Sequence, residues 1–368
     1  MVLTKIQRDK LLAPLQSVSG IVERRHTLPI LSNVLLEKKG ERLTLLATDI
    51  EIQVTTVAEG AGGEGDGAVT VGARKLQDIL RSLPEGAEVS LVLDEKRLQI
   101  CSGRSRFSLQ ILPANDFPRM TVTEGETKQF KISQRAFRQL LAKTQYAMAT
   151  QDVRYYLNGL MLLVERRELS TVATDGHRLA YASVEIDADF PRQEMIIPRK
   201  TVLELNRLLM DSDDPLTITL ASNQVRFSFS AVVLVSKVID GKFPDYERVV
   251  PVGLQNHFTV ARPVLLQAMN RAAILTNEKF RGVRIVLGDG SLKLIAANAE
   301  QEEAQEELEV EYTGDAIDVG FNIGYLLDVL NNVHVDEIKW SFNDANSSSL
   351  ITIPNNDRFK YVVMPMRI

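Results

Sequence analysis

Two hydrophobic patterns alternate along this chain. In six segments, apolar residues recur every three or four positions, which is the spacing of a helix that buries one face. These segments are 5–18, 73–83, 133–148, 199–210, 261–275 and 323–333. Short runs of β-branched and aromatic residues, bounded by Gly, Asp and Asn, lie between them and predict strands. Examples are 89–93, 98–101, 107–111, 216–220, 225–229 and 232–238. The pattern therefore predicts an α+β protein with six helices and roughly two dozen strands.

The same pattern occurs three times. Residues 43–50 read L-T-L-L-A-T-D-I, and A-T-D returns in T-V-A-T-D-G-H-R-L-A at 171–180, an offset of 126 residues. A third version, L-K-L-I-A-A-N-A at 292–299, lies 123 residues further on. Phe117-Pro118 recurs as Phe243-Pro244, again at an offset of 126 residues. Repeats of about 120 residues have the size of a domain. We therefore expect three similar domains, at 1–126, 127–254 and 255–368.

Composition narrows the class of protein. The 368 residues are 45% hydrophobic and 25% charged, which is typical of a globular protein. The one cysteine, Cys101, excludes an intrachain disulfide and fits a reducing compartment. The N-terminal sequence lacks the basic and apolar regions of a signal peptide, and no apolar stretch reaches the roughly 18 residues of a membrane span. We therefore expect a cytoplasmic protein.

One stretch combines side chains that could carry out chemistry. Asp175 and His177 lie two residues apart beside Arg178, a combination that could serve acid–base catalysis. The other two repeats lack the histidine, and the chain has no nucleophile motif. The pattern favours a structural interpretation, in which Asp175 ends a strand, Gly176 turns and 177–179 begin the next strand. Catalysis remains the alternative, and a binding role for the same turn stays open.

Patterns for metals and cofactors are absent from the sequence. The four histidines, at 26, 177, 257 and 334, lack the spacing of metal ligands. The chain also has no phosphate-binding loop of the Walker type. We therefore expect no metal site and no cofactor.

Charge is distributed unevenly over the repeats. The net charge of −5 argues against a protein that coats nucleic acid by bulk charge. Residues 1–126 carry a net −1, residues 257–368 carry −6, and the residues between carry +2. The third repeat holds the acidic run 300–307, whereas the first holds a basic cluster at 96, 97, 104 and 106. A basic edge and an acidic edge favour head-to-tail pairing, and two chains paired in this way can close a ring.

Specific motifs occur in all three repeats. They are S-G-R-S-R-F-S-L at 102–109, Q-D-V-R-Y-Y-L-N-G at 151–159, A-T-D-G-H-R-L at 173–179, V-I-D-G-K-F-P-D-Y at 238–246, N-E-K-F-R-G-V-R at 277–284 and Y-V-V-M-P-M-R at 361–367. With this combination the chain resembles, over its whole length, the bacterial DNA polymerase III beta subunits, the family of beta sliding clamps.

The resemblance implies a fold and a function. Subunits of this family have the DNA clamp fold of three similar domains, and two subunits pair head to tail in a closed ring. Helices line the hole and sheets lie outside. The ring encircles duplex DNA and acts as a processivity factor, without an enzymatic activity. The implied partners are a second copy of the chain, double-stranded DNA of any sequence, replicative polymerase subunits, the clamp loader and other proteins with a clamp-binding motif.

The resemblance also implies three sets of site residues. Contacts to DNA, mostly to phosphates, match Arg25, Gln151, Arg154, Tyr155, Arg199 and Lys200. A pocket for a short peptide with Gln and apolar residues matches Leu157, Thr174, Gly176, His177, Arg178, Leu179, Pro244, Arg248, Val249, Tyr325, Val362, Met364, Pro365, Met366 and Arg367, with Ser349 preferred among the serines at 347–349. The subunit interface matches Lys75, Ile79, Leu83, Arg97, Arg104, Arg106, Phe107 and Leu109 in the first repeat, and Ile274, Leu275, Glu300, Glu302 and Glu303 in the third.

Two interpretations from other classes of function remain as alternatives. One is an enzyme that uses Asp175, His177 and Arg178 on a repeat scaffold. The other is a scaffold or adaptor protein with no role on nucleic acid. The motifs in all three repeats favour the clamp over both.

Overall fold

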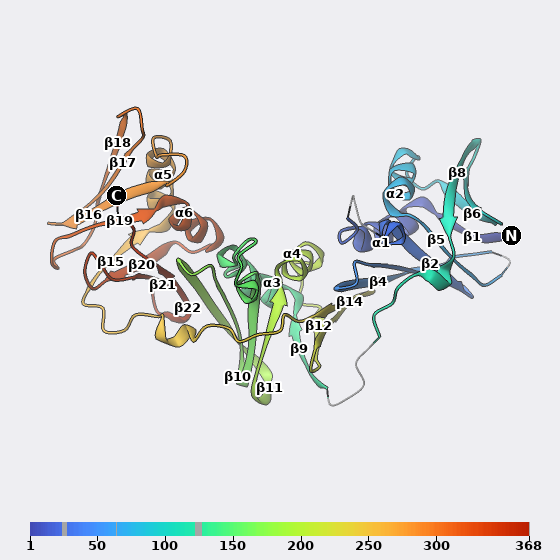
Figure 1. Cartoon of the computed structure of the whole chain (residues 1–368), viewed down its shortest axis with the longest axis horizontal. Coiled ribbons are helices and arrows are strands. Elements are labelled where there is room, and N and C mark those ends of the chain that lie inside the picture. The colour runs from blue at the N-terminus through green and yellow to red at the C-terminus, as the bar shows by residue number, and fades with distance from the viewer. Residues whose placement is uncertain (24–27, 64, 122–126, 368) are drawn as a thin grey trace. The chain divides into compact units, whose positions relative to one another are not determined.

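The computed structural model describes residues 1–23, 28–63, 65–121 and 127–367. These residues form six α-helices and 22 strands, in agreement with the hydrophobic pattern (Figure 1). The helices are α1 (Arg8–Ser19), α2 (Ala73–Ser82), α3 (Gln134–Ala142), α4 (Arg199–Leu208), α5 (Arg262–Ala273) and α6 (Ile323–Asn332). The sequence therefore predicts both the number and the order of the helices.

Helix α3 is shorter than its apolar pattern predicts. It ends at Ala142, and the short 3-10 helix η3 (Gln145–Ala147) follows instead of a continued α-helix. Between them, the hydroxyl of the buried Thr144 donates to the carbonyl oxygen of Leu140 at 3.3 Å. A β-branched side chain that bonds the preceding turn disfavours helix continuation. The apolar residues beyond this point are buried by the 3-10 turn.

The first of two compact units contains one antiparallel sheet. It comprises Met1–Arg135 and Leu203–Val238. Twelve strands follow one another across this sheet: β1 (Val2–Gln7), β6 (Glu88–Asp94), β7 (Arg97–Ser102), β8 (Ser105–Leu112), β5 (Gly67–Gly72), β2 (Asn33–Lys39), β3 (Arg42–Thr48), β4 (Ile52–Glu59), β14 (Val232–Lys237), β13 (Gln224–Phe229), β12 (Pro215–Leu220) and β9 (Lys128–Ser133). Helix α1 buries its apolar face on β3 and β4, and α2 packs beside α1.

The second compact unit contains two antiparallel sheets. It comprises Ala136–Val202 and the chain from Ile239 onward. The larger sheet runs β10 (Gly159–Thr174), β11 (Arg178–Pro198), β22 (Asn356–Val363), β21 (Ser349–Ile353), β20 (Glu337–Phe342) and β15 (Asn256–Ala261). The smaller runs β18 (Glu303–Glu309), β17 (Ser291–Ala297), β16 (Gly282–Gly288) and β19 (Ile317–Asn322). Helices α5 and α6 pack side by side in this unit (Figure 1).

The compact units are not the three repeats that the sequence predicts. Strands β12, β13 and β14 belong to the second repeat by sequence, yet β14 pairs with β4 of the first repeat, with Leu234 opposite Val54. This pairing makes one continuous sheet from parts of two repeats. Backbone hydrogen bonds between distant strands, which leave no trace in local periodicity, therefore decide where the chain divides into compact units.

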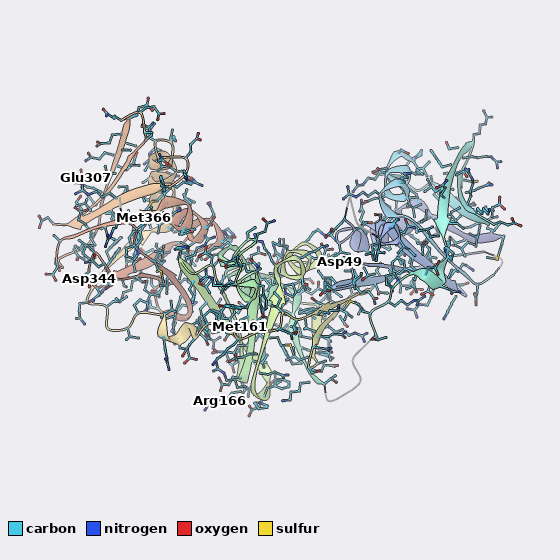
Figure 2. The ribbon with its side chains drawn as sticks, in the orientation of Figure 1. Asp49, Met161, Arg166, Glu307, Asp344 and Met366 are labelled. Atoms are coloured by element: carbon cyan, nitrogen blue, oxygen red, sulfur yellow. The ribbon has the colours of Figure 1, made fainter. Side chains whose placement is uncertain are left out.

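The repeat is nevertheless visible in the packing. Leu35, Leu46 and Phe117 form one buried cluster in the first unit. The residues 126 positions later, Met161, Val172 and Phe243, belong to one buried cluster in the second unit. Met161 lies on β10 and is labelled in Figure 2. Both repeats thus fill the same part of their core with a Phe from the Phe-Pro pair.

Replacing Phe243 with Ala tests this packing. Phe243 is 5% exposed, and removal of a buried Phe side chain lowers the free energy of unfolding by about 3–5 kcal/mol. Native-state hydrogen exchange at β10 amides should show this loss in the second unit. Phe280→Ala is the matched control, because Phe280 is 59% exposed and its removal should change stability by less than about 0.5 kcal/mol. Equal effects of both variants would contradict the placement of Phe243 in the buried cluster of the second unit.

Candidate functional site

The turn between β10 and β11 is built by its own side chains. Thr174 Oγ1 donates to the carbonyl oxygen of Arg178 (2.6 Å) and accepts from the Gly176 N–H (3.1 Å). Asp175 Oδ1 accepts from the N–H groups of His177 (2.9 Å) and Arg178 (3.1 Å). Gly176 has a φ of 91°, a left-handed conformation that glycine adopts at little cost. The strand–turn–strand interpretation is therefore confirmed, and the Asp175 carboxylate is engaged in structural bonds.

The first repeat uses the same turn. Thr48 Oγ1 donates to the carbonyl oxygen of Ile52 (2.8 Å) and accepts from the Ile50 N–H (3.0 Å). Asp49 Oδ1 accepts from the N–H groups of Glu51 (3.0 Å) and Ile52 (2.7 Å). Each bond corresponds to one in the second repeat, 126 positions later. The shared A-T-D sequence is therefore a turn scaffold.

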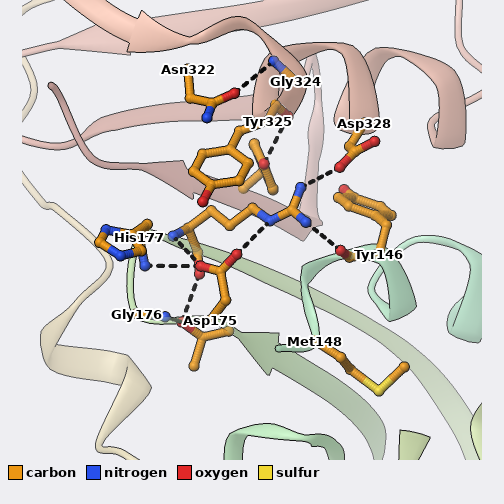
Figure 3. Close-up of polar contacts among 12 residues, drawn as sticks. Tyr146, Met148, Asp175, Gly176, His177, Asn322, Gly324, Tyr325 and Asp328 are labelled. Carbon is orange, nitrogen blue, oxygen red and sulfur yellow. Dashed lines mark hydrogen bonds and ion pairs between the residues drawn. The ribbon is translucent and has the colours of Figure 1, made fainter. Parts of the chain in front are cut away.

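Arg178 joins this turn to two other elements (Figure 3). Its Nε donates to Asp175 (3.1 Å), Nη1 to Asp328 on α6 (2.5 Å), and Nη2 to the carbonyl oxygen of Tyr146 in η3 (2.6 Å). The guanidinium also lies 4.4 Å from the centre of the Tyr325 ring. These contacts hold the turn, η3 and α6 together.

The Arg178 side chain is only 9% exposed, so its charge needs these partners. Burial acts to lower the pKa of the guanidinium, but Tyr361 and the two carboxylates outweigh it and raise the pKa. Tyr361 is itself fully buried and donates to the Tyr325 carbonyl oxygen (2.8 Å). Burial raises the pKa of Tyr361 above its ordinary value. Arg178 is therefore a fixed charge in the wall of the site.

A small apolar pocket of about 180 Å³ opens beside this turn. Nine of the residues that line it belong to the predicted peptide pocket: Leu157, Thr174, Gly176, Arg178, Leu179, Pro244, Val249, Val362 and Met364. Leu179 and Val362 face each other across β11 and β22 and are buried. Met364 is 40% exposed at the edge of the pocket. The structure thus brings together residues from four distant parts of the sequence.

Two further residues line the pocket. Arg154 was predicted as a DNA contact, but its guanidinium lies on the pocket wall, where Nη2 donates to Asp152 (2.9 Å) and to the carbonyl oxygen of Asp175 (3.3 Å). The hydrogen bond from Arg154 lowers the pKa of Asp152 to about 2. Tyr156 was missed by the sequence analysis. The motif Y-Y-L, in which Tyr156 precedes the predicted pocket residue Leu157, could have indicated that Tyr156 lines the pocket.

The other predicted pocket residues lie around the pocket without lining it. The His177 carbonyl oxygen accepts from the Met364 N–H (2.9 Å), and Tyr325 stacks under Arg178. The side chain of Arg248 is 87% exposed and pairs with Asp245. Met366 bonds through its backbone to Gly320, beside Pro365 and the exposed Arg367.

Ser349 is a packing residue in this structure. It is completely buried on β21, and its hydroxyl accepts a hydrogen bond from Trp340 Nε1 at 3.0 Å. Trp340 is itself fully buried. This position does not match the preference for Ser349 as a pocket residue. The sequence alone does not reveal that the Ser349 hydroxyl is hydrogen-bonded to a tryptophan.

The remaining DNA-contact candidates lie near the same loop, except one. Gln151 and Tyr155 are exposed, Tyr155 by 58%, and Gln151 has a φ of 56°. Arg199 and Lys200 begin α4 and are half-buried; the Arg199 guanidinium donates to the Met148 carbonyl oxygen (3.2 Å). Arg25 lies outside the described residues. The loop 151–157 thus presents some side chains to solvent and others to the pocket.

The interface candidates of the first unit lie on β8 and around it. From 105 to 110, β8 pairs with β7 alone, so its other edge is open among the described strands. Phe107 and Leu109 alternate with exposed residues on this edge. Lys75, Arg97, Arg104 and Arg106 are exposed and Ile79 is half-buried, whereas Leu83 is 7% exposed within its own unit.

The interface candidates of the second unit lie on another open edge. Strand β18 pairs only with β17 in the described sheet. Glu307, labelled in Figure 2, belongs to β18. Ile274 is 77% exposed and Leu275 is half-buried at the end of α5, and Glu300, Glu302 and Glu303 are exposed. This edge is acidic, whereas the edge at β8 is basic.

Two kinds of feature are absent from the described residues. No group of three or more His, Cys, Asp or Glu residues among them is placed to hold a metal ion. No helix in this part of the chain has the length and apolar character needed to cross a membrane.

The chain matches three family models in succession. Residues 2–121 match the N-terminal domain of the DNA polymerase III beta subunit, residues 131–245 its central domain, and residues 247–367 its C-terminal domain. The fold is thus the three-domain DNA clamp fold.

Similar proteins support the same assignment. The beta sliding clamp of Pseudomonas aeruginosa is 48% identical over 369 residues, and that of Escherichia coli K12 is 46% identical over 363 residues; each comparison covers 99% of both chains. A crystal structure of the DNA polymerase III subunit beta from P. aeruginosa has a TM-score of 0.95 at 46% identity, covering 99% of this chain and 100% of that one. The chain therefore belongs to the bacterial DNA polymerase III beta subunits, the sliding clamps that act as processivity factors in DNA replication.

Proposed function

We propose that two copies of this chain pair head to tail and close a ring around duplex DNA. The open β8 edge of one copy would pair with the open β18 edge of the other, because unpaired strand edges are ready to add a strand. The observation that supports this pairing is the charge of the two edges, basic at Arg104 and Arg106 and acidic at Glu300, Glu302 and Glu303. Ile274 would supply apolar contact area. In this proposal the domains are 1–126, 127–254 and 255–368.

Enclosure, rather than tight binding, would hold the DNA. A set of basic and polar side chains, Arg25, Gln151, Tyr155, Arg199 and Lys200, would contact phosphates without reading the base sequence. The chain would catalyse no reaction. Of the residues considered for catalysis, Asp175 is engaged by backbone N–H groups and by Arg178, bonds that hold the turn. Such a protein works in the cytoplasm, where the bacterial chromosome lies.

The pocket beside the turn would dock partner proteins. Its apolar floor of Leu179 and Val362 and its flexible Met364 suit a short peptide with Gln and apolar side chains. Arg178 would provide a wall that does not move when a ligand binds. Polymerase subunits, the clamp loader and other proteins with such a peptide would compete for this pocket.

DNA retention tests enclosure directly. After loading on nicked circular DNA, the protein should remain bound through gel filtration, and it should be lost once a restriction enzyme linearises the circle. The reason is topological, since a closed ring leaves DNA only at an end. Equal retention on circular and linear DNA would reject enclosure.

The pairing of chains is tested at Ile274. Ile274→Asp places a charge in the proposed apolar contact, and the dimer dissociation constant, measured by light scattering and sedimentation, should rise at least about tenfold. Phe280→Asp is the control, because Phe280 is exposed on the same unit but lies outside the proposed contact. A dimer that persists unchanged in Ile274→Asp would place the interface elsewhere.

The docking pocket is tested at its exposed edge. Met364→Lys should weaken binding of a synthetic polymerase-tail peptide at least about tenfold in fluorescence anisotropy, because a cation enters an apolar pocket. Retention on circular DNA should be unchanged. Arg248→Ala is the matched control, since Arg248 does not line the pocket, and its effect should be small. Unaltered peptide binding by Met364→Lys would contradict the assignment.

A further inference from the structure

The first compact unit contains a second pocket, of about 220 Å³, on the turn between β3 and β4. We infer that this pocket is a second docking site, and that it takes an extended partner segment which places an apolar side chain next to a carboxylate. The comparison with the first pocket rests on the peptide-docking function proposed above.

The two pockets occupy corresponding places in two repeats. Thr48 and Pro118 line the second pocket, and Thr174 and Pro244, each 126 positions later, line the first. Because the turn and the Phe-Pro segment recur together, the hollow between them recurs as well. The second pocket therefore follows from the internal repeat.

A backbone hydrogen bond extends the correspondence to the opposite wall. The Met364 N–H donates to the His177 carbonyl oxygen at 2.9 Å, and the Lys237 N–H donates to the Glu51 carbonyl oxygen at the same distance. Glu51 and His177 are 126 positions apart. Lys237 thus takes the place that Met364 has in the first pocket, and the second pocket has a cation where the first has an apolar side chain.

The wall of the second pocket is held in place before any ligand binds. The Met120 N–H donates to Gln53 Oε1 at 2.8 Å, and Gln224 Nε2 donates to the carbonyl oxygen of Thr121 at 3.2 Å. Gln53 is nearly buried on β4, and Gln224 begins β13. Met120 and Thr121 both line the pocket. A preformed wall lowers the ordering cost of binding.

The backbone conformation of Ile50 indicates a function for the apolar surface of the second pocket. It occupies the position of Gly176 and has a φ of 80°, a conformation that is unfavourable for a β-branched residue. The hydrogen bonds of the turn come from Thr48 and Asp49, so the fold does not require isoleucine there. The residue is 38% exposed and lines the pocket, so part of its apolar surface is open to a ligand. A ligand that contacts Ile50 would account for isoleucine at this position.

The charges around the pocket select the ligand. Lys237 pairs with Glu51 at 3.1 Å and Arg119 pairs with Glu37 at 2.7 Å, with the two cationic side chains 43% and 48% exposed. The Lys237–Glu51 pair is exposed and held by one bond, so it is weak and exchanges partners readily, whereas Arg119 binds both carboxylate oxygens of Glu37 (3.0 and 2.7 Å) and stays paired. A ligand carboxylate can therefore bind Lys237 while its neighbouring apolar side chain contacts Ile50 and Met120.

Methyl NMR on the full-length protein tests the site. The probe is the synthetic peptide acetyl-Leu-Glu-Leu-Glu-amide, with acetyl-Leu-Gln-Leu-Gln-amide as the matched neutral control. At about 10 mM, enough to saturate a millimolar site, the acidic peptide should shift the Met120 methyl signal, and the neutral peptide should bind at least about threefold more weakly. Lys237→Gln should abolish this preference.

Ile50→Gly separates a binding role from a structural one. Glycine relieves the strain, so the melting temperature should rise, whereas peptide affinity read at Met120 should fall at least about fivefold. A lower melting temperature with unchanged affinity would mean that Ile50 serves the fold and would overturn the inference. An unshifted Met120 signal in the wild-type protein would overturn it as well.

The two pockets are distinguished by a variant in the first. Met364→Lys should leave the Met120 shifts unchanged, and loss of those shifts would show that the peptide binds only the first pocket, against the inference. The Met364 methyl signal of the wild-type protein reports separately on the first pocket. If the Met364 signal does not shift with a peptide that carries Gln and apolar residues, peptide docking at the first pocket is contradicted. The Met120 signal then still shows whether the second pocket binds its own peptide.

Discussion

The geometry of the pocket beside the β10–β11 turn depends on the burial of one guanidinium. Arg178 is almost fully removed from water, and a buried cation is tolerated only when it is paired and hydrogen-bonded. Its partners come from the β10–β11 turn, from η3 and from α6, so the same bonds that satisfy the charge hold three elements together. The pocket opens beside this junction. The hydrogen bonds that pair Arg178 also hold the wall of the pocket in place.

The turn next to Arg178 shows how one scaffold acquires different surfaces. In both repeats a threonine and an aspartate make the hydrogen bonds that close the turn. The side chains at the two positions after the aspartate do not take part in closing the turn and differ between the repeats. The second repeat has glycine and histidine there, and the first has isoleucine and glutamate. Recurrence in the sequence therefore marks the architecture, and departure from the repeat marks the surfaces for which we propose binding.

The open edges of β8 and β18 also differ in their side chains. An exposed edge invites pairing with any other strand, and here one edge is basic and the other acidic. Opposite charges favour the pairing of β8 with β18, and like charges disfavour the pairing of either edge with its own copy. Charge on these two edges thus limits the open strands to one kind of partner.

The sequence by itself determined the elements whose signal is local. Apolar spacing predicted the six helices, the repeat predicted the shared turn, and matching motifs predicted nine of the residues that line the pocket. The helices and the turn depend on hydrogen bonds and burial within a few residues, which periodicity and turn chemistry record, whereas the pocket residues were predicted from the resemblance to a family.

Only the tertiary structure decided what depends on distant partners. The orientation of Arg154 toward the pocket follows from Asp152 and from the backbone of Asp175, and the burial of Ser349 follows from Trp340. The pairing of β14 with β4 joins parts of two repeats in one continuous sheet. The second pocket likewise has Lys237 in its lining, and this residue bonds to Glu51, 186 residues away. Contacts across such separations are set by the packing of whole sheets, and a local pattern carries no record of them.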